Sequence, residues 1–359
     1  MSSLEYEIDL LAKMVKINTD SISKKGYDEC ASLIVEEAKQ NSLDAEIVDG
    51  EKGARDNLSR PNVIITLNTG SDVTLLLESH FDIVPPGPNW IYPPFELTLE
   101  NGKAYGRGTA DNKSGIVAAI GALRQLTKEK LDINIKLIAG VDEEVGGRYG
   151  ANYVLNDYGL KGDAALILDT GPERLYLGAS GIIWGKIIVE GKQGHAGYPF
   201  KAKNAIDETM KLLEKLEVYK NTVEKKESIL LAPPEAPRQF VWGRYTVTMI
   251  KAGEKENIIP GTCEVRFDRR LIPEESLEQA EKELKDFFQK AVENIGCKAS
   301  LEIINGQTGY YTSKDLVFVQ TVQESINKSL GRKILYAGEL GGNDGSFFSK
   351  KGIIPIPTG

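Results

Sequence analysis

Hydrophobic positions in the first half of the chain switch between helical spacing and short continuous runs. The run at 73–77 is apolar at nearly every position, which is typical of a strand buried on both faces. The pattern predicts helices at 5–17 and 27–40, strands at 45–48, 62–67 and 73–77, a helix at 114–126, a strand at 133–139, a helix near 149–155 and a strand at 164–168. Strands that alternate with helices predict an α/β fold, with a mostly parallel sheet covered by helices on both faces.

After about residue 178 the pattern changes from continuous apolar runs to alternation. Strands predicted at 182–190, 245–251 and 262–267 alternate apolar and polar residues, and amphipathic helices are predicted at 204–216 and 276–295. Strands with one solvent-exposed face, packed on two helices, predict an inserted α+β domain. A helix at 316–326 and a strand at 353–356 return to the first pattern, so we expect a catalytic domain at 1–176 and 306–359 and an inserted domain at 177–305.

Composition and charge narrow the classes of partner. The 359 residues carry a net charge of −8, so no basic field would attract nucleic acid or an anionic membrane. No apolar run approaches the roughly 20 residues of a membrane span, and the first residues carry acids where a signal peptide carries bases, so we expect a cytoplasmic protein. Three widely spaced cysteines indicate neither a disulfide framework nor a thiolate zinc site.

Polar side chains capable of binding a metal follow several predicted strands. The carboxyl ends of parallel strands meet at one edge of a sheet, where ligands collect. His80 and Asp82 point to the same side, so a carboxylate can orient an imidazole that binds a metal. The other candidates are Asp111 in a glycine-rich turn, the adjacent Glu143 and Glu144, and Asp169 at the end of ALILD.

Each candidate also has an ordinary structural interpretation, as a core histidine, a helix cap or an acid in the first turn of a helix. Their joint occurrence at one predicted edge favours a divalent metal in a hydrolytic site, because histidine and carboxylates without thiolates suit such chemistry. Nucleotide binding by GRGTADNKSG is the competing hypothesis. It is disfavoured because Asn112 stands before Lys113, where a phosphate-binding loop has glycine.

The residue sequences of these motifs resemble those of a known family. SHFDIVP, Trp90 to Phe95, YGRGTADNKSG, DEEVGG, Asp169 and GGNDG are similar, in order, to the dinuclear zinc amidohydrolases that include acetylornithine deacetylase, succinyl-diaminopimelate desuccinylase, aminoacylase and glutamate carboxypeptidase. The resemblance covers nearly the whole chain and implies a zinc-exopeptidase-like fold with an inserted lid and dimerisation domain.

The same resemblance implies two Zn²⁺ per chain in the complete protein, with cobalt or manganese as alternatives. His80 and Asp169 would bind one ion, Asp111 would bridge, and Glu144 would bind the second. Asp82 would orient His80. Glu143 would be the general base that deprotonates the bridging water and later protonates the leaving amine.

In the inserted domain, His195 within GKQGHAGYP resembles the lid histidine that contacts the scissile carbonyl across a dimer interface. Asn257 in ENIIPG and Arg270 in FDRRL match positions that grip the substrate's carboxylate, and the spacing leaves open whether Arg269 shares this task. Gly341, Gly342 and Asn343 would line the substrate pocket through backbone groups. A surface histidine, a surface arginine and an ordinary turn are the alternatives.

Two positions depart from the family pattern. Ser79 replaces the usual glycine before the metal-binding histidine, which is a small change. The pattern also continues, past the strand matching IIPIPTG, to a histidine that completes the second zinc site, and the sequence holds only His80 and His195. We expect that the chain is truncated, and the alternative is a second site that is incomplete in this protein.

These observations predict a metal-dependent hydrolase that cleaves the amide bond of a small N-acyl amino acid, with a metal-bound hydroxide as the nucleophile and Glu143 as general base. A di- or tripeptidase or carboxypeptidase acting on a short peptide is the first alternative. A catalytically impaired relative that binds a metabolite or partner is the second. We expect a homodimer formed through the lid, and no nucleic-acid or membrane partner.

Overall fold

A computed structural model describes residues 2–359, and the chain folds into two compact units. Unit 1 comprises residues up to Tyr176, Thr312–Leu335 and Asn343–Gly359, and unit 2 comprises Leu177–Tyr311 and Tyr336–Gly342. No helix within residues 2–359 combines the length and the apolarity that a membrane crossing requires.

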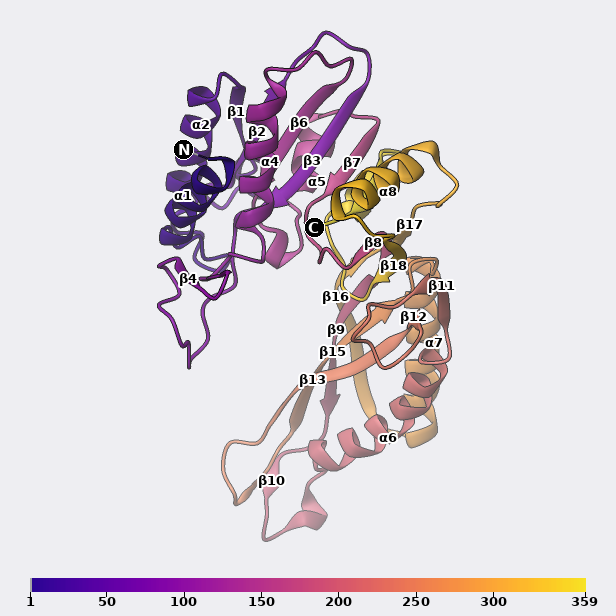
Figure 1. The fold of residues 1–359 in the computed structure, drawn as a ribbon. Coiled ribbons are helices and arrows are strands. Elements are labelled where there is room, and N and C mark those ends of the chain that lie inside the picture. Colours follow the sequence, from indigo (N-terminus) through magenta and orange to yellow (C-terminus); the bar gives the residue numbers. More distant parts are fainter. Residues whose placement is uncertain (1) are drawn as a thin grey trace. The chain divides into compact units, whose positions relative to one another are not determined.

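Unit 1 is built on a six-stranded sheet with the order β1-β2-β6-β3-β7-β19 (Figure 1). Its strands are β1 (Asp44–Asp49), β2 (Pro61–Leu67), β3 (Thr74–His80), β6 (Asn134–Gly140), β7 (Ala164–Ile167) and β19 (Ile354–Pro357). The pairs β3/β6, β3/β7 and β7/β19 are parallel, whereas β1/β2 and β2/β6 are antiparallel. The mostly parallel sheet predicted from the sequence is confirmed, with an antiparallel edge.

Helices cover both faces of this sheet because its strands are apolar on both sides. On β2, Val63 and Ile65 belong to the core cluster that includes α1 (Ser3–Lys16), α2 (Tyr27–Gln40) and α4 (Lys113–Leu126). Ile64, between them, belongs to the opposite cluster, which includes α5 (Ala151–Tyr153), the π-helix η2 (Val154–Tyr158) and α9 (Gly345–Lys350). The remaining elements of unit 1 are α3 (Glu51–Ala54), the hairpin β4 (Thr98–Glu100) and β5 (Lys103–Tyr105), the 3₁₀ turn η1 (Glu143–Val145) and α8 (Val317–Leu330).

Unit 2 contains a four-stranded antiparallel sheet with the order β13-β15-β9-β16. These strands are β9 (Gly181–Glu190), β13 (Arg244–Ala252), β15 (Thr262–Leu271) and β16 (Lys298–Gln307). Alternate residues such as Val265 and Phe267 pack against α6 (Ala205–Val223) and α7 (Leu277–Ile295), which form one core with the sheet. The predicted α+β domain with one wet sheet face is therefore present.

Smaller elements complete unit 2. They are β8 (Arg174–Ala179), β10 (Gly194–His195), η3 (Pro199–Lys201), β11 (Glu227–Leu231), β12 (Phe240–Trp242), β14 (Ile258–Ile259), β17 (Tyr310–Tyr311) and β18 (Leu335–Glu339). Tyr336–Gly342 belongs to unit 2, whereas the sequence analysis placed it in the second catalytic segment, 306–359. The reason is strand pairing, because β18 joins a small sheet with β8 and β17.

Candidate functional site

His80 is the last residue of β3 and is 1% exposed. Its Nδ1 lies 3.3 Å from Oδ1 of Asp82 and 3.1 Å from the backbone oxygen of the same residue, so the ring is held from behind. Its Nε2 is buried and forms no hydrogen bond with any residue in 2–359. A buried ring nitrogen that the chain leaves unsatisfied is the arrangement expected of a metal ligand.

Two carboxylates face that nitrogen. Oδ1 of Asp111 lies 3.1 Å from Nε2 of His80, and Oδ1 of Asp169 lies 3.7 Å from it. Asp111 ends the glycine-rich turn before α4, and Asp169 follows β7. Asn112 donates from Nδ2 to Oδ1 of Asp169 at 2.9 Å, which fixes the orientation of that carboxylate. The hydroxyl of Ser79 donates to the carbonyl of Asn112 at 2.9 Å, so this turn is tied to β3.

The donor set fits a divalent metal ion. One atom each from His80, Asp111 and Asp169 lies within 4.8 Å of the other two. One imidazole nitrogen and two carboxylate oxygens, with no thiolate, suit zinc and other divalent ions of hydrolytic enzymes. Glu144 was also predicted as a ligand and lies on η1, outside this group of three.

Asp82 connects His80 to the turn that carries the two glutamates. Its Oδ1 accepts from the backbone N–H of Glu143 at 3.3 Å, and its Oδ2 accepts from that of Glu144 at 3.2 Å. A single buried carboxylate therefore orients both the imidazole and η1. Glu143 is 19% exposed at its side chain, and its Oε2 lies 4.0 Å from Nε2 of His80.

Asp142 anchors η1 from the other side. It adopts a left-handed conformation with φ of 64° and is 3% exposed. Its carboxylate pairs with Lys24 Nζ at 2.7 Å and with Arg60 Nε at 2.8 Å. The sequence analysis assigned no role to this residue. Its function here is to hold the turn after β6 in place.

The two glutamates of η1 have raised pKa values. Burial raises the pKa of Glu143 well above its usual value, and Asp344 and Asp169 add to the rise while His80 opposes it. Burial, followed by Asp111, raises the pKa of Glu144 to about 7. Such values suit a group that takes up and releases a proton near neutral pH.

The short distance between His80 and Asp111 shifts the pKa values of both side chains. Burial alone would lower the pKa of His80, but the acceptors Asp111, Asp169 and Asp82 outweigh it and raise that pKa well above its usual value. The proximity of His80 lowers the pKa of Asp111. This cluster therefore holds a positive charge readily, as a proton or as a metal ion.

Asp344, to which the sequence analysis gave no role, is a buried acid whose charge contributes to the raised pKa of Glu143. It precedes α9 and is 3% exposed, and burial, opposed by His80 and reinforced by Asp169, raises its pKa to about 7. Gly147 leaves room for it, because a Cβ there would lie 2.2 Å from Oδ1 of Asp344. The signal was the GGNDG motif, which was interpreted only as a substrate-facing turn.

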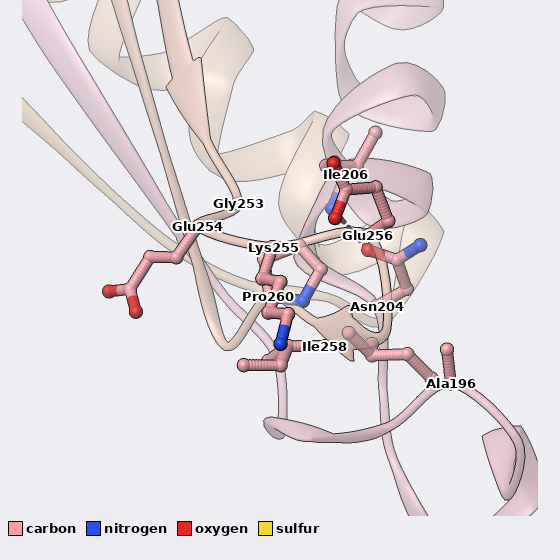
Figure 2. Close-up of a pocket in the computed structure, with 10 residues that line it drawn as sticks. Ala196, Asn204, Ile206, Gly253, Glu254, Lys255, Glu256, Ile258 and Pro260 are labelled. Carbon is pink, nitrogen blue, oxygen red and sulfur yellow. Dashed lines mark hydrogen bonds between the residues drawn. The ribbon is translucent and has the colours of Figure 1, made fainter.

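In unit 2, His195 and Asn257 are brought together. β10 pairs with β14, which places His195 opposite Ile258, and the N–H of Ala196 donates to the carbonyl of Asn257 at 2.9 Å. Nδ1 of His195 accepts from the N–H of Gly197 at 3.0 Å, so the neutral ring carries its proton on Nε2. Beside them is an open cavity of about 510 Å³, whose lining includes Ala196, Asn204 and Glu256 (Figure 2).

The two arginines of FDRRL have different environments. Arg269 is fully buried and donates from Nη2 to both carboxylate oxygens of Glu275, at 2.7 and 2.9 Å. This pairing makes Arg269 a structural residue and answers the question that the spacing left open. Arg270 points to the other face of β15 and is partly exposed, with Nε bonded to Asp268 at 2.9 Å.

The predicted glycine loop is divided between the units. Gly341 and Gly342 belong to unit 2, and the carbonyl of Gly341 accepts from the N–H of Ser180 at 2.9 Å. Asn343 belongs to unit 1, where its Oδ1 accepts from the N–H of Gly345 at 3.1 Å. Their role in substrate binding stays a prediction.

Comparison with known proteins identifies relatives over nearly the full chain. The family model described as peptidase family M20/M25/M40 matches residues 76–359. An uncharacterized metallohydrolase of Methanocaldococcus jannaschii is 30% identical, covering 98% of this chain and 91% of the relative. Succinyl-diaminopimelate desuccinylase of Sulfurovum sp. is 28% identical, covering 98% and 90% respectively.

Among solved structures, the fold is similar to that of an M20 family metallo-carboxypeptidase, Sso-CP2, from Sulfolobus solfataricus. The TM-score is 0.79 at 20% identity, covering 98% of this chain and 90% of the other. At this identity, the likeness is one of fold.

Proposed function

Because the chain belongs to peptidase family M20/M25/M40 and is therefore a metal-dependent hydrolase, we propose that it cleaves the amide bond of a small N-acyl amino acid, in the manner of a deacetylase or desuccinylase. The observation that carries the proposal is the unsatisfied Nε2 of buried His80, faced by Asp111 and Asp169. The native ion in this proposal is zinc, with cobalt or manganese as alternatives, and the number of two ions per chain applies to the complete protein.

His80, Asp111 and Asp169 are the residues that would hold the metal, with Glu144 as the ligand of a second ion. When bound, zinc supplies a Lewis acid that polarises the scissile carbonyl and lowers the pKa of a water. Asp82 keeps His80 in the required tautomer and orientation. Asn112 does the same for the carboxylate of Asp169.

Glu143 acts as the proton shuttle. Its carboxylate accepts the proton of the attacking water and then delivers it to the nitrogen of the leaving amine. Two observations support this role. The side chain is only partly exposed and lies near the metal-binding face of His80, and its backbone N–H is fixed by Asp82.

His195 is the group that we assign to the developing oxyanion. Because Nδ1 accepts from Gly197, the proton on Nε2 is free to be donated. A neutral donor aimed at the oxygen of the tetrahedral intermediate stabilises the transition state more than the ground state. Asn257 and Arg270, with Gly341, Gly342 and Asn343, are the proposed contacts to the rest of the substrate.

The geometry of unit 2 supports a homodimer. Thr262 pairs with Glu190 near the His195 end of the sheet, and Arg270 lies eight residues further along β15 (Figure 1). That separation is roughly 27 Å along a strand. A dipeptide spans roughly 7 Å, so one substrate touches both side chains only when they come from different copies of the chain.

The central test is Glu143→Gln. The amide cannot carry the proton, so we expect kcat to fall roughly 10²- to 10⁴-fold, while metal content measured by elemental analysis stays at the wild-type level. Glu129→Gln, at an exposed position after α4, is the matched control and should retain full activity. Normal turnover in the Glu143 variant would disprove the assignment.

A di- or tripeptidase or carboxypeptidase is the second candidate, which the peptidase family match favours. A panel of N-acetyl and N-succinyl amino acids, assayed beside dipeptides and tripeptides, separates the two by kcat/KM. A non-catalytic binding protein is the third candidate, and it would be supported if the full-length protein bound no metal ion or only one per chain. The cytoplasmic location stays a prediction from the sequence.

A further inference from the structure

Two arginines lie directly opposite each other on neighbouring strands of the four-stranded sheet of unit 2. Arg244 opens β13, and its Cα partner on β15 is Arg270, so their side chains project from the same face. Like charges directly opposite one another in a sheet are destabilising. Such a pair needs a negative charge beside it.

Asp268 forms a direct ion pair with only one of the two arginines. Asp268 binds Nε of Arg270 at 2.9 Å and also accepts from Nε1 of Trp184 at 2.8 Å. Within residues 2–359, Arg270 donates side-chain hydrogen bonds only through Nε, which leaves its two terminal nitrogens for a ligand. The counter-ion of neighbouring Arg269 is Glu275, on the opposite face.

Arg244 forms no ion pair with a carboxylate in the described part of the chain. Its Nη2 donates to Ser180 Oγ at 3.1 Å and to the carbonyl of Leu340 at 2.7 Å, both of which are neutral acceptors. Its Nη1 is buried and has no hydrogen-bond partner there. Burial, and then the charge of Arg270, lower the pKa of Arg244 to about 10, so the group remains charged at neutral pH.

The surroundings hold this guanidinium in a fixed position. The backbone N–H of Ser180 donates to the carbonyls of Glu339 and Gly341, at 3.2 and 2.9 Å, which locks the loop that receives Nη2. The ring of Trp242 lies 5.2 Å from the guanidinium carbon. A donor that is immobilised before binding loses little conformational entropy when a ligand arrives.

We propose that Arg244 and Arg270 together bind the free carboxylate of the substrate's amino-acid part, with Arg244 donating through Nη1. Asp268 and Glu339 supply negative charge near Arg244, and Nη1 of Arg244 with the terminal nitrogens of Arg270 are the donors available to the substrate's carboxylate. The inference rests on the proposed function, and it adds a specificity-determining residue, Arg244, that the sequence motifs did not indicate.

Arg244→Gln tests the proposal by kinetics on two substrates: the best N-acyl amino acid or peptide of the panel, and the same compound with its carboxylate converted to a carboxamide. We expect KM for the free acid to rise roughly 10- to 100-fold with a smaller change in kcat, because a charge-assisted hydrogen bond is lost. KM for the carboxamide should be unchanged. Arg266→Gln, on the neighbouring strand β15 and paired with Glu264, is the control and should behave as the wild type.

An equal change for both substrates, or no change for either, would overturn the proposal, since a purely structural arginine does not distinguish them. If Arg244→Gln fails to fold, Arg244→Lys decides, because it keeps the charge without the second terminal nitrogen, and KM for the free acid should still rise.

A binding measurement separates failure of this proposal from failure of the proposed function. Calorimetric titration of succinate into the metal-loaded protein requires no turnover, and we expect binding to the wild type that is weakened in Arg244→Gln and unaffected in Arg266→Gln. If no compound of the panel is hydrolysed but this pattern is found, the function fails and the Arg244 site stands. Equal succinate affinity in all three proteins, or no binding to the wild type, refutes the site.

Discussion

Carboxyl groups around His80 bind protons more readily in the folded chain than in the unfolded chain. The pKa of Glu144 rises from 4.5 to about 7 and that of Asp344 from 3.8 to about 7. For acids with raised values, stability is present at low pH and is lost as pH rises towards the folded pKa. The raised pKa of His80 changes stability in the same direction. The lowered pKa of Asp111 has the opposite effect, but only below about pH 3.8.

We therefore expect the metal-free protein, prepared with a chelator, to melt at a higher temperature at pH 5 than at pH 7.5. Bound metal ions replace the protons, so the loaded protein should lose or reverse this dependence. Scanning calorimetry across that range measures both curves, and Asp344→Asn should flatten the metal-free one. A metal-free melting temperature that rises from pH 5 to pH 7.5 would contradict the assignment of these shifts.

At the scale of elements, the turn after β6 depends on one buried ionic anchor. Asp142 pairs with Lys24 and Arg60, and asparagine tolerates the same left-handed backbone, so Asp142→Asn removes the charge alone. Leaving Lys24 buried without a counter-ion should destabilise the protein by about 3 kcal/mol. Chemical unfolding measures this loss.

The same variant should also reduce kcat, because η1 carries Glu143 and Glu144. Asp132→Asn, at an exposed position before β6, is the matched control and should change neither quantity. Unchanged stability in Asp142→Asn would show that the anchor is not required to hold the turn.

At the scale of the whole molecule, the separation of His195 and Arg270 within unit 2 predicts active sites that are shared between two copies. His195→Gln and Glu143→Gln should each be nearly inactive alone. Mixed dimers, formed by co-expression with two affinity tags, should recover part of the wild-type activity, because one of their sites combines an intact Glu143 with an intact His195. Sedimentation velocity checks that the mixed species is a dimer.

Absence of recovery in verified mixed dimers would show that both residues act within one chain. In that case the substrate would have to be longer than a dipeptide, or Arg270 would have to contact something other than the substrate.

The sequence determined the outline of the fold and the residue types of the site. Periodicity distinguished the buried parallel strands from the half-wet strands of unit 2, because strand burial on one or two faces directly determines which positions must be apolar. Strand ends then indicated His80 and Asp169 as candidates, since parallel strands deliver their last residues to one edge, and a glycine-rich turn indicated Asp111. These inferences depend on local pattern, which the chain carries in full.

Tertiary structure alone decided the contacts between residues distant in sequence. The pairing of Asp142 with Lys24 and Arg60, the approach of Asp344 to the metal-binding face, and the burial of Arg269 beside Arg270 leave no periodic trace. The strand register that sets Arg244 opposite Arg270 is likewise fixed by packing and by a bulge on β13. The local sequence of neither strand specifies this register. Local sequence specifies which groups are available, whereas the partner that each charge meets depends on how distant segments pack.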